Sequence, residues 1–258
     1  MLLAFDVGNT TIAVGIFRGK KLVKCWKIKT DRDRTADEYG ASLLNLFRVS
    51  GFQAKAVTGA IISSVVPPLT AVIEDTCLEY FGAKALVVGP GLKTGMPILY
   101  EAPLEVGADR ITASVAAFEK YGGPAIVVDF GTATTFDAVS EKGEYLGGAI
   151  APGIQIAAEA LYLKTARLPR IEIKKPKRAI GRTTVSSMQS GLYFGYIGLV
   201  TNTIEEIRKE LGKNARVVAT GGFGSQVAGE LPLIEAYEPD LVLDGLRIIY
   251  DRNRDARP

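Results

Sequence analysis

The sequence predicts an α/β fold made of two related halves, because apolar strands alternate with helical segments and one strand–turn–strand pattern occurs twice. Residues 2–16 and residues 125–139 each contain an apolar strand, a turn with the pattern Asp-x-Gly and a second strand. Three residues recur at one constant offset of 123 positions: Asp6, Gly8 and Thr11 as Asp129, Gly131 and Thr134. A repeat of this length is typical of two duplicated domains and not of a solenoid.

Each copy continues into a second, polar turn that contains glycine. Residues 18–21 read Arg-Gly-Lys-Lys, and residues 141–144, at the same offset, read Glu-Lys-Gly-Glu. Each copy thus has the strand, the polar turn with glycine and the second strand that predict a hairpin. We therefore expect one mixed sheet flanked by helices in each half.

Caps and apolar spacing predict the elements that follow the first hairpin. Thr35 and Glu38 form a capping-box pattern at the start of a helix. A short apolar strand is predicted over residues 60–66, and Pro67 opens a helix that ends at Gly82.

The rest of the chain continues this alternation. Its predicted elements are a strand at 86–88, a turn-rich segment at 89–103, a helix at 108–121, a helix from Thr184 to Gly212, a strand at 217–220 and a last helix at about 245–256. We expect domains at 1–118 and 119–258, with the last helix able to pack back on the first domain.

The composition is that of an ordinary globular protein, with 47% hydrophobic and 23% charged residues among 258. The net charge of +3 gives no reason to expect nucleic acid or a membrane as a partner. The chain has no histidine, which excludes Ser-His-Asp and Cys-His catalysis and His-ligated metals. The first residues lack the basic region of a signal peptide, so we expect a cytoplasmic protein.

Three glycine-containing turns follow apolar strands and are the candidates for phosphate binding. They lie at residues 6–10, 129–134 and 220–224. Glycine lets backbone amides approach a phosphate closely, and neighbouring hydroxyls add donors. Asp6 and Asp129 could each hold a hydrated Mg²⁺ that contacts the phosphate. The alternative is that these segments are only tight hairpins whose Asp and Thr side chains satisfy the turn backbone.

Several motifs together are more specific than the turns alone. They are Asp6-Val-Gly-Asn-Thr10, Ile62-Ser-Ser-Val-Val-Pro67, Gly107-Ala-Asp-Arg110, Asp129-Phe-Gly-Thr-Ala-Thr134, Gly148-Ala-Ile-Ala-Pro-Gly153 and Met188-Gln-Ser-Gly191. Over essentially the whole chain this set resembles the type III pantothenate kinases, within the superfamily of acetate and sugar kinases, actin and heat-shock chaperone ATPases. The resemblance implies two duplicated actin-like (ribonuclease H-like) domains with nucleotide in the cleft.

The resemblance also implies an activity. The family phosphorylates pantothenate with ATP to 4′-phosphopantothenate, the first step toward coenzyme A. It is cytoplasmic and homodimeric, requires Mg²⁺ and is activated by a monovalent cation, K⁺ or NH₄⁺.

Residue by residue, the resemblance implies a set of site roles. The ATP contacts are Asp6, Val7, Gly8, Asn9, Thr10, Thr11, Ile12, Ala13 and Thr132. The pantothenate contacts are Tyr100, Gly107, Ala108, Asp109, Arg110 and Thr184, with Asp109 as the catalytic general base. Asp129 corresponds to the monovalent-cation site, in place of the Mg²⁺ role that its position alone suggests, and Asp6 holds Mg²⁺ through the phosphate.

Two departures from the family pattern flank the substrate residues. The chain has Glu101-Ala102 where many relatives have Asp-Asn, and Thr183 where relatives often have Asn. The residues leave three other functions open: a kinase of the same superfamily acting on a sugar or carboxylate, an actin-like filament or ATP-dependent binding module, and an accessory factor in gene regulation.

Overall fold

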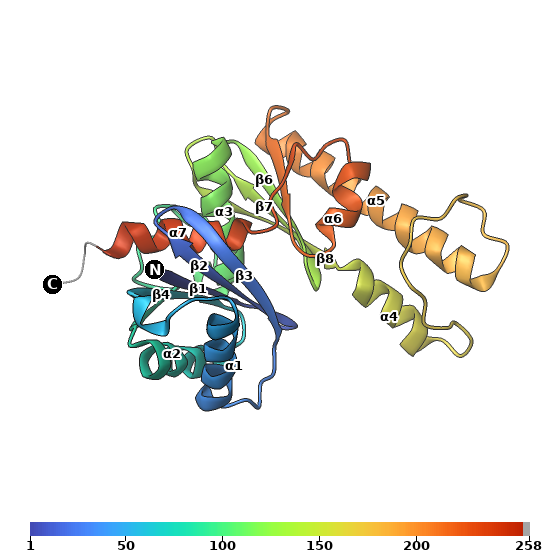
Figure 1. Ribbon diagram of the computed structural model, residues 1–258. Helices are drawn as coiled ribbons and strands as arrows, with labels where there is room; N and C mark the ends of the chain where they lie inside the picture. The colour runs from blue at the N-terminus through green and yellow to red at the C-terminus, as the bar shows by residue number, and fades with distance from the viewer. Residues whose placement is uncertain (255–258) are drawn as a thin grey trace. The chain divides into compact units, whose positions relative to one another are not determined.

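The first sheet begins the chain and has five strands. The computed structural model describes residues 1–254 (Figure 1). The strands are β1 (Leu2–Val7), β2 (Thr11–Arg18), β3 (Lys21–Lys29), β4 (Gly59–Ser64) and β5 (Ala85–Val87). Their order is β3-β2-β1-β4-β5, with the first three antiparallel and β1, β4 and β5 parallel.

The second sheet repeats this arrangement. Its strands are β6 (Ala125–Phe130), β7 (Ala133–Val139), β8 (Tyr145–Pro152), β9 (Arg216–Thr220) and β10 (Ala236–Tyr237). The order is β10-β9-β6-β7-β8, so β6 to β10 occupy the places that β1 to β5 have in the first sheet. Strand directions also agree, with two antiparallel and two parallel pairings. The predicted duplication of a mixed sheet is therefore confirmed.

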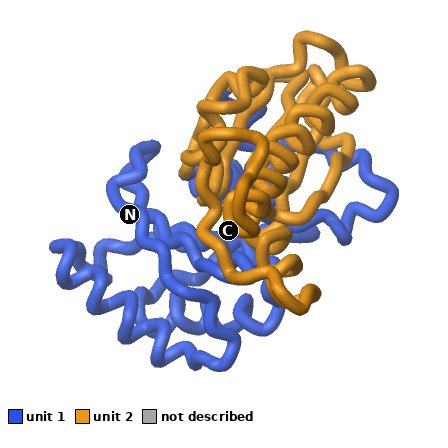
Figure 2. The backbone as a smooth tube through the Cα atoms, turned by 90° about the vertical axis from the view of Figure 1, so that its right-hand side faces the viewer, with its two compact units in different colours: residues 1–120, 240–258 blue, residues 121–239 orange. Residues whose placement is uncertain are grey.

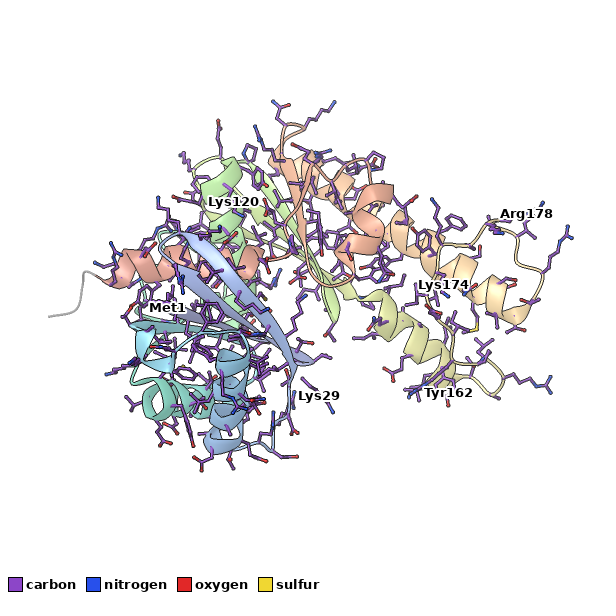
Figure 3. All side chains as sticks on the ribbon, in the orientation of Figure 1. Met1, Lys29, Lys120, Tyr162, Lys174 and Arg178 are labelled. Atoms are coloured by element: carbon purple, nitrogen blue, oxygen red, sulfur yellow. The ribbon has the colours of Figure 1, made fainter. Side chains whose placement is uncertain are left out.

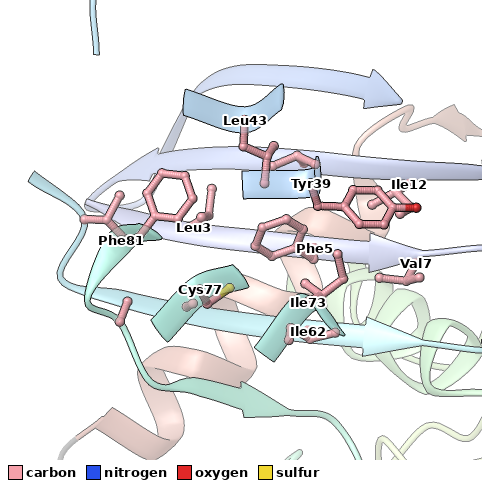
Figure 4. Packing of buried hydrophobic residues seen from close by; sticks show 14 of the residues in the cluster. Leu3, Phe5, Val7, Ile12, Tyr39, Leu43, Ile62, Ile73, Cys77 and Phe81 are labelled. Atoms are coloured by element: carbon pink, nitrogen blue, oxygen red, sulfur yellow. The ribbon is translucent and has the colours of Figure 1, made fainter. Parts of the chain in front are cut away.

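Two helices cover one face of the first sheet. They are α1 (Ala36–Val49) and α2 (Pro67–Phe81). Alternate residues of the strands, such as Phe5 and Ile62, point toward Leu43 of α1 and Ile73 of α2 (Figure 4). Each such buried side chain stabilises the fold by roughly 1.5–3 kcal/mol. The capping box at Thr35 is present, as the sequence predicts.

The last helix, α7 (Leu241–Asn253), packs on β1, β2 and β4. It begins four residues before the predicted Gly245, and the predicted residues 255 and 256 lie outside the described residues. The sequence suggested a boundary at Gly245, but this glycine lies inside the helix, where a Cβ would collide with the carbonyl oxygen of Thr112. Glycine is therefore needed for close packing of α7 on α3 (Ala108–Tyr121) and does not mark the start of α7.

The chain forms two compact units, coloured in Figure 2. Unit 1 contains Met1–Lys120 together with the chain from Asp240 onward, and unit 2 contains Tyr121–Pro239. These units differ from the expected ranges 1–118 and 119–258 mainly at the last helix.

Unit 2 carries its own helices, α4 (Ile154–Lys164), α5 (Thr184–Leu211) and the single-turn α6 (Gly224–Val227). Side chains of α5, including Tyr196 and Val200, are buried against the second sheet. Short 3-10 turns are η1 (Ala54–Ala56), η2 (Pro103–Glu105) and η3 (Ala228–Glu230). Within residues 1–254, no helix has the length and apolar character needed to cross a membrane.

Candidate active site

The hairpin of β1 and β2 contains eight of the nine predicted ATP contacts, residues 6–13. Asp6 is half-buried near the end of β1, and the amide of Gly8 donates to the carbonyl oxygen of Thr11 at 3.1 Å. Asn9 and Thr10 are exposed at the tip. A glycine followed by exposed amide and hydroxyl groups provides the hydrogen-bond donors that a phosphate requires.

The segment after β3 fixes this turn. The Thr30 amide donates to the Thr10 carbonyl oxygen at 3.0 Å, and the Thr30 hydroxyl donates to the Gly8 carbonyl oxygen at 2.7 Å. The Arg32 guanidinium donates to Oδ1 of Asn9 at 2.9 Å. Sequence reasoning missed both Thr30 and Arg32. Arg32 adds a positive charge beside the turn, which favours an anionic ligand there.

The turn between β6 and β7 is one residue shorter than its counterpart. Val7 at the end of β1 pairs with Ile12, whereas Phe130 at the end of β6 pairs with Thr134. Thr134 therefore occupies the place of Ile12 and not that of Thr11. The predicted equivalence of Thr11 and Thr134 is wrong. The two residues match in the sequence, but the turn of unit 2 is one residue shorter, so they stand at different positions in the strand pairing.

Thr134 is a core residue and does not lie at the ligand surface. Its hydroxyl oxygen lies 2.6 Å from that of Tyr196, and both groups are buried. Burial raises the pKa of Tyr196 to about 12, while the hydrogen bond to Thr134 acts in the opposite direction. Thr132 is the exposed hydroxyl of this turn, beside Gly131, whose amide donates to the Ala133 carbonyl oxygen at 3.1 Å.

Asp129 lies where two glycine turns of unit 2 meet. Gly221, in the turn after β9, has φ +91°, and a Cβ there would collide with Oδ1 of Asp129. The Phe223 amide donates to the Phe130 carbonyl oxygen at 3.2 Å, which fixes the second turn against the first. The Asp129 carboxylate therefore lies against the backbone at Gly221.

Gly153, between β8 and α4, is a second close approach. A Cβ at Gly153 would collide with the Thr132 carbonyl oxygen and lie 2.7 Å from that of Gly131. Gly153 stands 123 positions after Thr30, which packs against the corresponding turn of unit 1. The offset of the duplicated hairpins, applied a few residues further along the chain, was the signal that could have identified both residues.

Asp109 lies in the first turn of α3, at the N-terminus of the helix, and is half-buried. The Arg110 amide donates to Oδ1 of Asp109 at 2.8 Å. Burial raises the pKa of Asp109, and the Arg110 amide and guanidinium oppose this rise without cancelling it. A carboxylate whose pKa is raised accepts a proton more readily, as a general base must.

The turn between β1 and β2 lies close to the start of α3 within unit 1. The Val65 amide donates to the Val7 carbonyl oxygen at 3.1 Å, and Cγ1 of Val65 lies 3.5 Å from the position of a Cβ at Gly107. The structure therefore brings residues 6–13 close to residues 107–110 through the chain that leaves β4. Tyr100 is in unit 1 as well, 38% exposed in the segment that precedes η2.

The remaining predicted residues belong to unit 2. Thr184 is exposed in the first turn of α5, next to Thr183, whose hydroxyl accepts from the Ser186 amide at 3.1 Å. Thr183 thus serves as the cap of α5, a role that asparagine also fills, so the departure from the family pattern keeps the cap.

A metal ion held by protein ligands alone does not fit this site. Among residues 1–254, no cluster of three or more Cys, Asp or Glu side chains could hold a metal. Mg²⁺ commonly uses one or two carboxylates and completes its shell with phosphate oxygens and water. Asp6, half-buried below an exposed turn rich in donors, fits a metal bound in that way.

Comparisons with known proteins agree with this geometry. The family model described as type III pantothenate kinase matches residues 2–206. The type III pantothenate kinase of Geobacter sulfurreducens is 54% identical over 255 residues, covering 99% of this chain and 100% of the relative. That of Moorella thermoacetica is 54% identical over 253 residues, covering 98% and 100%.

Solved structures share the fold at low sequence identity. A Campylobacter jejuni protein described as a candidate Baf family transcriptional activator aligns with a TM-score of 0.63 at 19% identity, over 98% of this chain and 99% of that one. The polyphosphate/ATP-glucomannokinase of an Arthrobacter species aligns with a TM-score of 0.51 at 13% identity, over 97% and 98%. These likenesses show the fold, that of duplicated actin-like domains.

Proposed function

The chain belongs to the type III pantothenate kinase family, and we propose how its own residues carry out the family's reaction. The enzyme transfers a phosphoryl group from ATP to pantothenate and forms 4′-phosphopantothenate, the first step of coenzyme A biosynthesis. ATP and a divalent metal ion are its requirements as a kinase. Because the reaction consumes ATP and serves biosynthesis, we place the enzyme in the cytoplasm.

Asp109 is the proposed general base. It takes the proton from the pantothenate hydroxyl while that oxygen attacks the γ-phosphorus of ATP, and ADP leaves. The support is the raised pKa of a half-buried carboxyl at a helix N-terminus, close to the first phosphate turn. This observation carries the assignment, because the other acidic residues near the turn between β1 and β2 differ: Asp31 and Asp33 are exposed, and Asp6 lies on β1.

The ATP phosphates are assigned to residues 6–13 and Thr132. Support comes from the exposed donors of the two turns and from the Arg32 charge beside Asn9. Asp6 would hold Mg²⁺ together with phosphate oxygens, and the bound ion would offset negative charge on the transferred group. Phosphoryl transfer requires alignment and charge neutralisation more than covalent chemistry, which these turns can provide.

Asp129 is assigned to a monovalent cation, K⁺ or NH₄⁺. Support comes from the Asp129 carboxylate, which offers oxygen ligands beside the backbone of the Gly221 turn. Its charge would add to the positive potential felt by the ATP phosphates.

Pantothenate is assigned to Gly107, Ala108, Asp109 and Arg110, with Tyr100 and Thr184 as further contacts. The planar Arg110 guanidinium is suited to paired hydrogen bonds with the pantothenate carboxylate. Tyr100 and Thr184 are both exposed, as residues that contact a substrate must be before it binds.

A homodimer is proposed on the surface of unit 2. Large apolar side chains are exposed on β8, α4, α5 and the segment between the helices: Leu146, Ile150, Ile156, Tyr162, Leu163, Ile180, Val185, Phe194 and Leu199. Figure 3 labels Tyr162, Lys174 and Arg178 in this region. Large exposed apolar surfaces are typical of sites of protein–protein interaction. Sedimentation equilibrium tests the proposal: a mass of twice 27.6 kDa supports it, and 27.6 kDa at micromolar concentration contradicts it.

The reaction is tested by ADP release from purified protein with ATP, Mg²⁺ and K⁺. Pantothenate, acetate and sugars are compared as acceptors, and the assay is repeated with Na⁺ in place of K⁺. Release that depends on pantothenate supports the proposed function, and its loss in Na⁺ supports the cation site. Stimulation by a sugar or acetate, but not by pantothenate, would contradict the proposed acceptor.

A further inference from the structure

Ser63 is a buried serine beside the carboxylate of the first turn. It lies on β4, which runs parallel to β1, and it is paired in register with Asp6. Paired residues of neighbouring strands project to the same face of a sheet. The opposite face carries Phe5 and Ile62 in the core formed with α1 and α2. Ser63 and Asp6 therefore share the face on which α7 packs.

The Ser63 hydroxyl has no partner although the residue is 0% exposed. Its neighbour Ser64 is fully engaged, because its Oγ bonds with the amide and carbonyl groups of Val66 and accepts from Thr70. Burying an unpaired hydroxyl is destabilising, and alanine would fit the same strand position. An orphaned donor in such a place requires an explanation, of which a functional partner is one.

The partner within reach is the Asp6 carboxylate. Neighbouring strands lie about 4.8 Å apart, so rotation about the Cα–Cβ bond of Ser63 can direct the hydroxyl at the side chain of the paired residue. Asp6 already has an interaction in the structure, but a carboxylate has about four acceptor positions, so a further donor can be added.

We propose that Ser63 is a positioning residue that donates its hydroxyl hydrogen to Asp6 and so orients the carboxylate toward metal-bound ATP. The proposal rests on the proposed function of Asp6. A hydrogen bond from a buried donor to a carboxylate is a strong one. It would hold one oxygen inward and leave the other directed at the exposed turn.

Ser114 provides a matched control. It too is 0% exposed with an unpaired hydroxyl, but it lies in the middle of α3. Ser63→Ala and Ser114→Ala each remove one small hydroxyl that is buried in unit 1, so both variants should fold. Ser114→Ala should unfold at the temperature of the wild type or higher, and Ser63→Ala slightly below it, because it loses the hydrogen bond to Asp6. A merely structural role for Ser63 predicts no further difference between the two.

The experiment measures turnover and nucleotide binding in both variants of the full chain. Ser63→Ala should lower kcat by about 10- to 100-fold, the range for one hydrogen bond to a charged group, and raise the Mg²⁺ concentration for half-maximal rate. Ser114→Ala should match the wild type in both measurements.

Calorimetry provides a readout without turnover. In Ser63→Ala the affinity for ATP with Mg²⁺ should fall, while the affinity for ATP with EDTA should not change. If Ser63→Ala matches Ser114→Ala in kcat, Mg²⁺ requirement and affinity for Mg²⁺-ATP, the proposal is overturned. This binding test stands even if the wild type uses an acceptor other than pantothenate, so failure of the proposed function can be told apart from failure of this proposal.

Discussion

Thr30 in unit 1 and Gly153 in unit 2 occupy the same place after the third strand of their sheets, yet they contact the neighbouring turn in different ways. Thr30 fixes its turn with a hydroxyl and an amide hydrogen bond. Gly153 has no side chain, and the backbone of its turn comes so close that a Cβ would collide with it. The first turn is one residue longer and carries Asn9, held by Arg32.

The duplicated sheets therefore keep their strand order while their turns are fixed by different means. Side-chain hydrogen bonds hold the turn of unit 1, which leaves exposed polar groups for a ligand. Backbone packing at Gly153 holds the turn between β6 and β7 of unit 2. The turn that contains Gly221 also packs closely there, against Asp129. Variants at three places in the molecule test how far this division extends.

The largest expected effect concerns Asp109, at the start of α3 in unit 1. Among the described residues, unit 2 has no acidic residue with a raised pKa at the start of a helix. Asp109→Asn should lower kcat by about 10²- to 10⁴-fold, as loss of a general base does, with ATP affinity near that of the wild type. Steady-state kinetics and calorimetry measure both. Unchanged turnover would remove Asp109 from the mechanism.

The same substitution should stabilise the protein at neutral pH. The pKa of Asp109 in the folded state lies above its ordinary value of 3.8. The contribution of this carboxyl to the free energy of unfolding is therefore fully present below pH 3.8 and is lost as the pH rises through the folded pKa. Asparagine stays neutral and avoids this loss. Thermal unfolding should therefore show Asp109→Asn above the wild type at pH 7, with the gap closing toward acid pH. A lower melting temperature at pH 7 would contradict the assigned cause of the shift.

The second prediction concerns the turn of unit 2. Gly153→Ala should destabilise the protein by about 3 kcal/mol, since neither the Thr132 nor the Gly131 carbonyl can move without disturbing the turn. Urea unfolding measures the change. Gly222→Ala is the control, because a Cβ at Gly222 has nothing within 4 Å. Equal stability of the two variants would mean that backbone packing does not hold this turn.

The smallest effect separates Thr134 from Thr11. Thr134→Val leaves the buried Tyr196 hydroxyl without its 2.6 Å partner and should cost about 1–2 kcal/mol. Thr11→Val, at an exposed position of the turn, should change stability by less than about 0.5 kcal/mol. Urea unfolding of Thr134→Val and Thr11→Val measures both changes. Equal losses of stability would mean that the two threonines are equivalent, as the sequence match suggests, and unequal losses that they are distinct, as the pairing of the strands indicates.

Most of the fold could be predicted because local signals agreed with the tertiary structure. The helix at 108–121 was predicted at its observed bounds, and Gly82 ends α2 as expected. Helix α4 was not predicted: its residues are apolar on nearly every side, and only Ile154 is buried in the isolated chain, so no helical stripe stands out. Strand β10 has two residues and no pattern of its own.

The site could be predicted only where a motif marked it. Asp109 stands in such a motif, and the structure adds the burial that raises its pKa. Thr30 and Arg32 act through contacts between segments about 20 residues apart, which no local pattern reports. The place of Ser63 depends on the register of two parallel strands and on the absence of a partner for its hydroxyl. Neither fact can be read from one strand's letters.

Helix α7 has a consequence for how the protein is made. The sheet of unit 1 is translated before unit 2, but the helix that packs on β1, β2 and β4 is translated after unit 2. Until then, one apolar face of the nascent sheet lacks its cover while the whole of unit 2 is translated. Unit 2 is continuous in the chain and can fold as it emerges. We infer that unit 2, although it is translated later than the sheet of unit 1, can finish folding before unit 1 does. Truncation before Leu241 would therefore damage unit 1 more than unit 2.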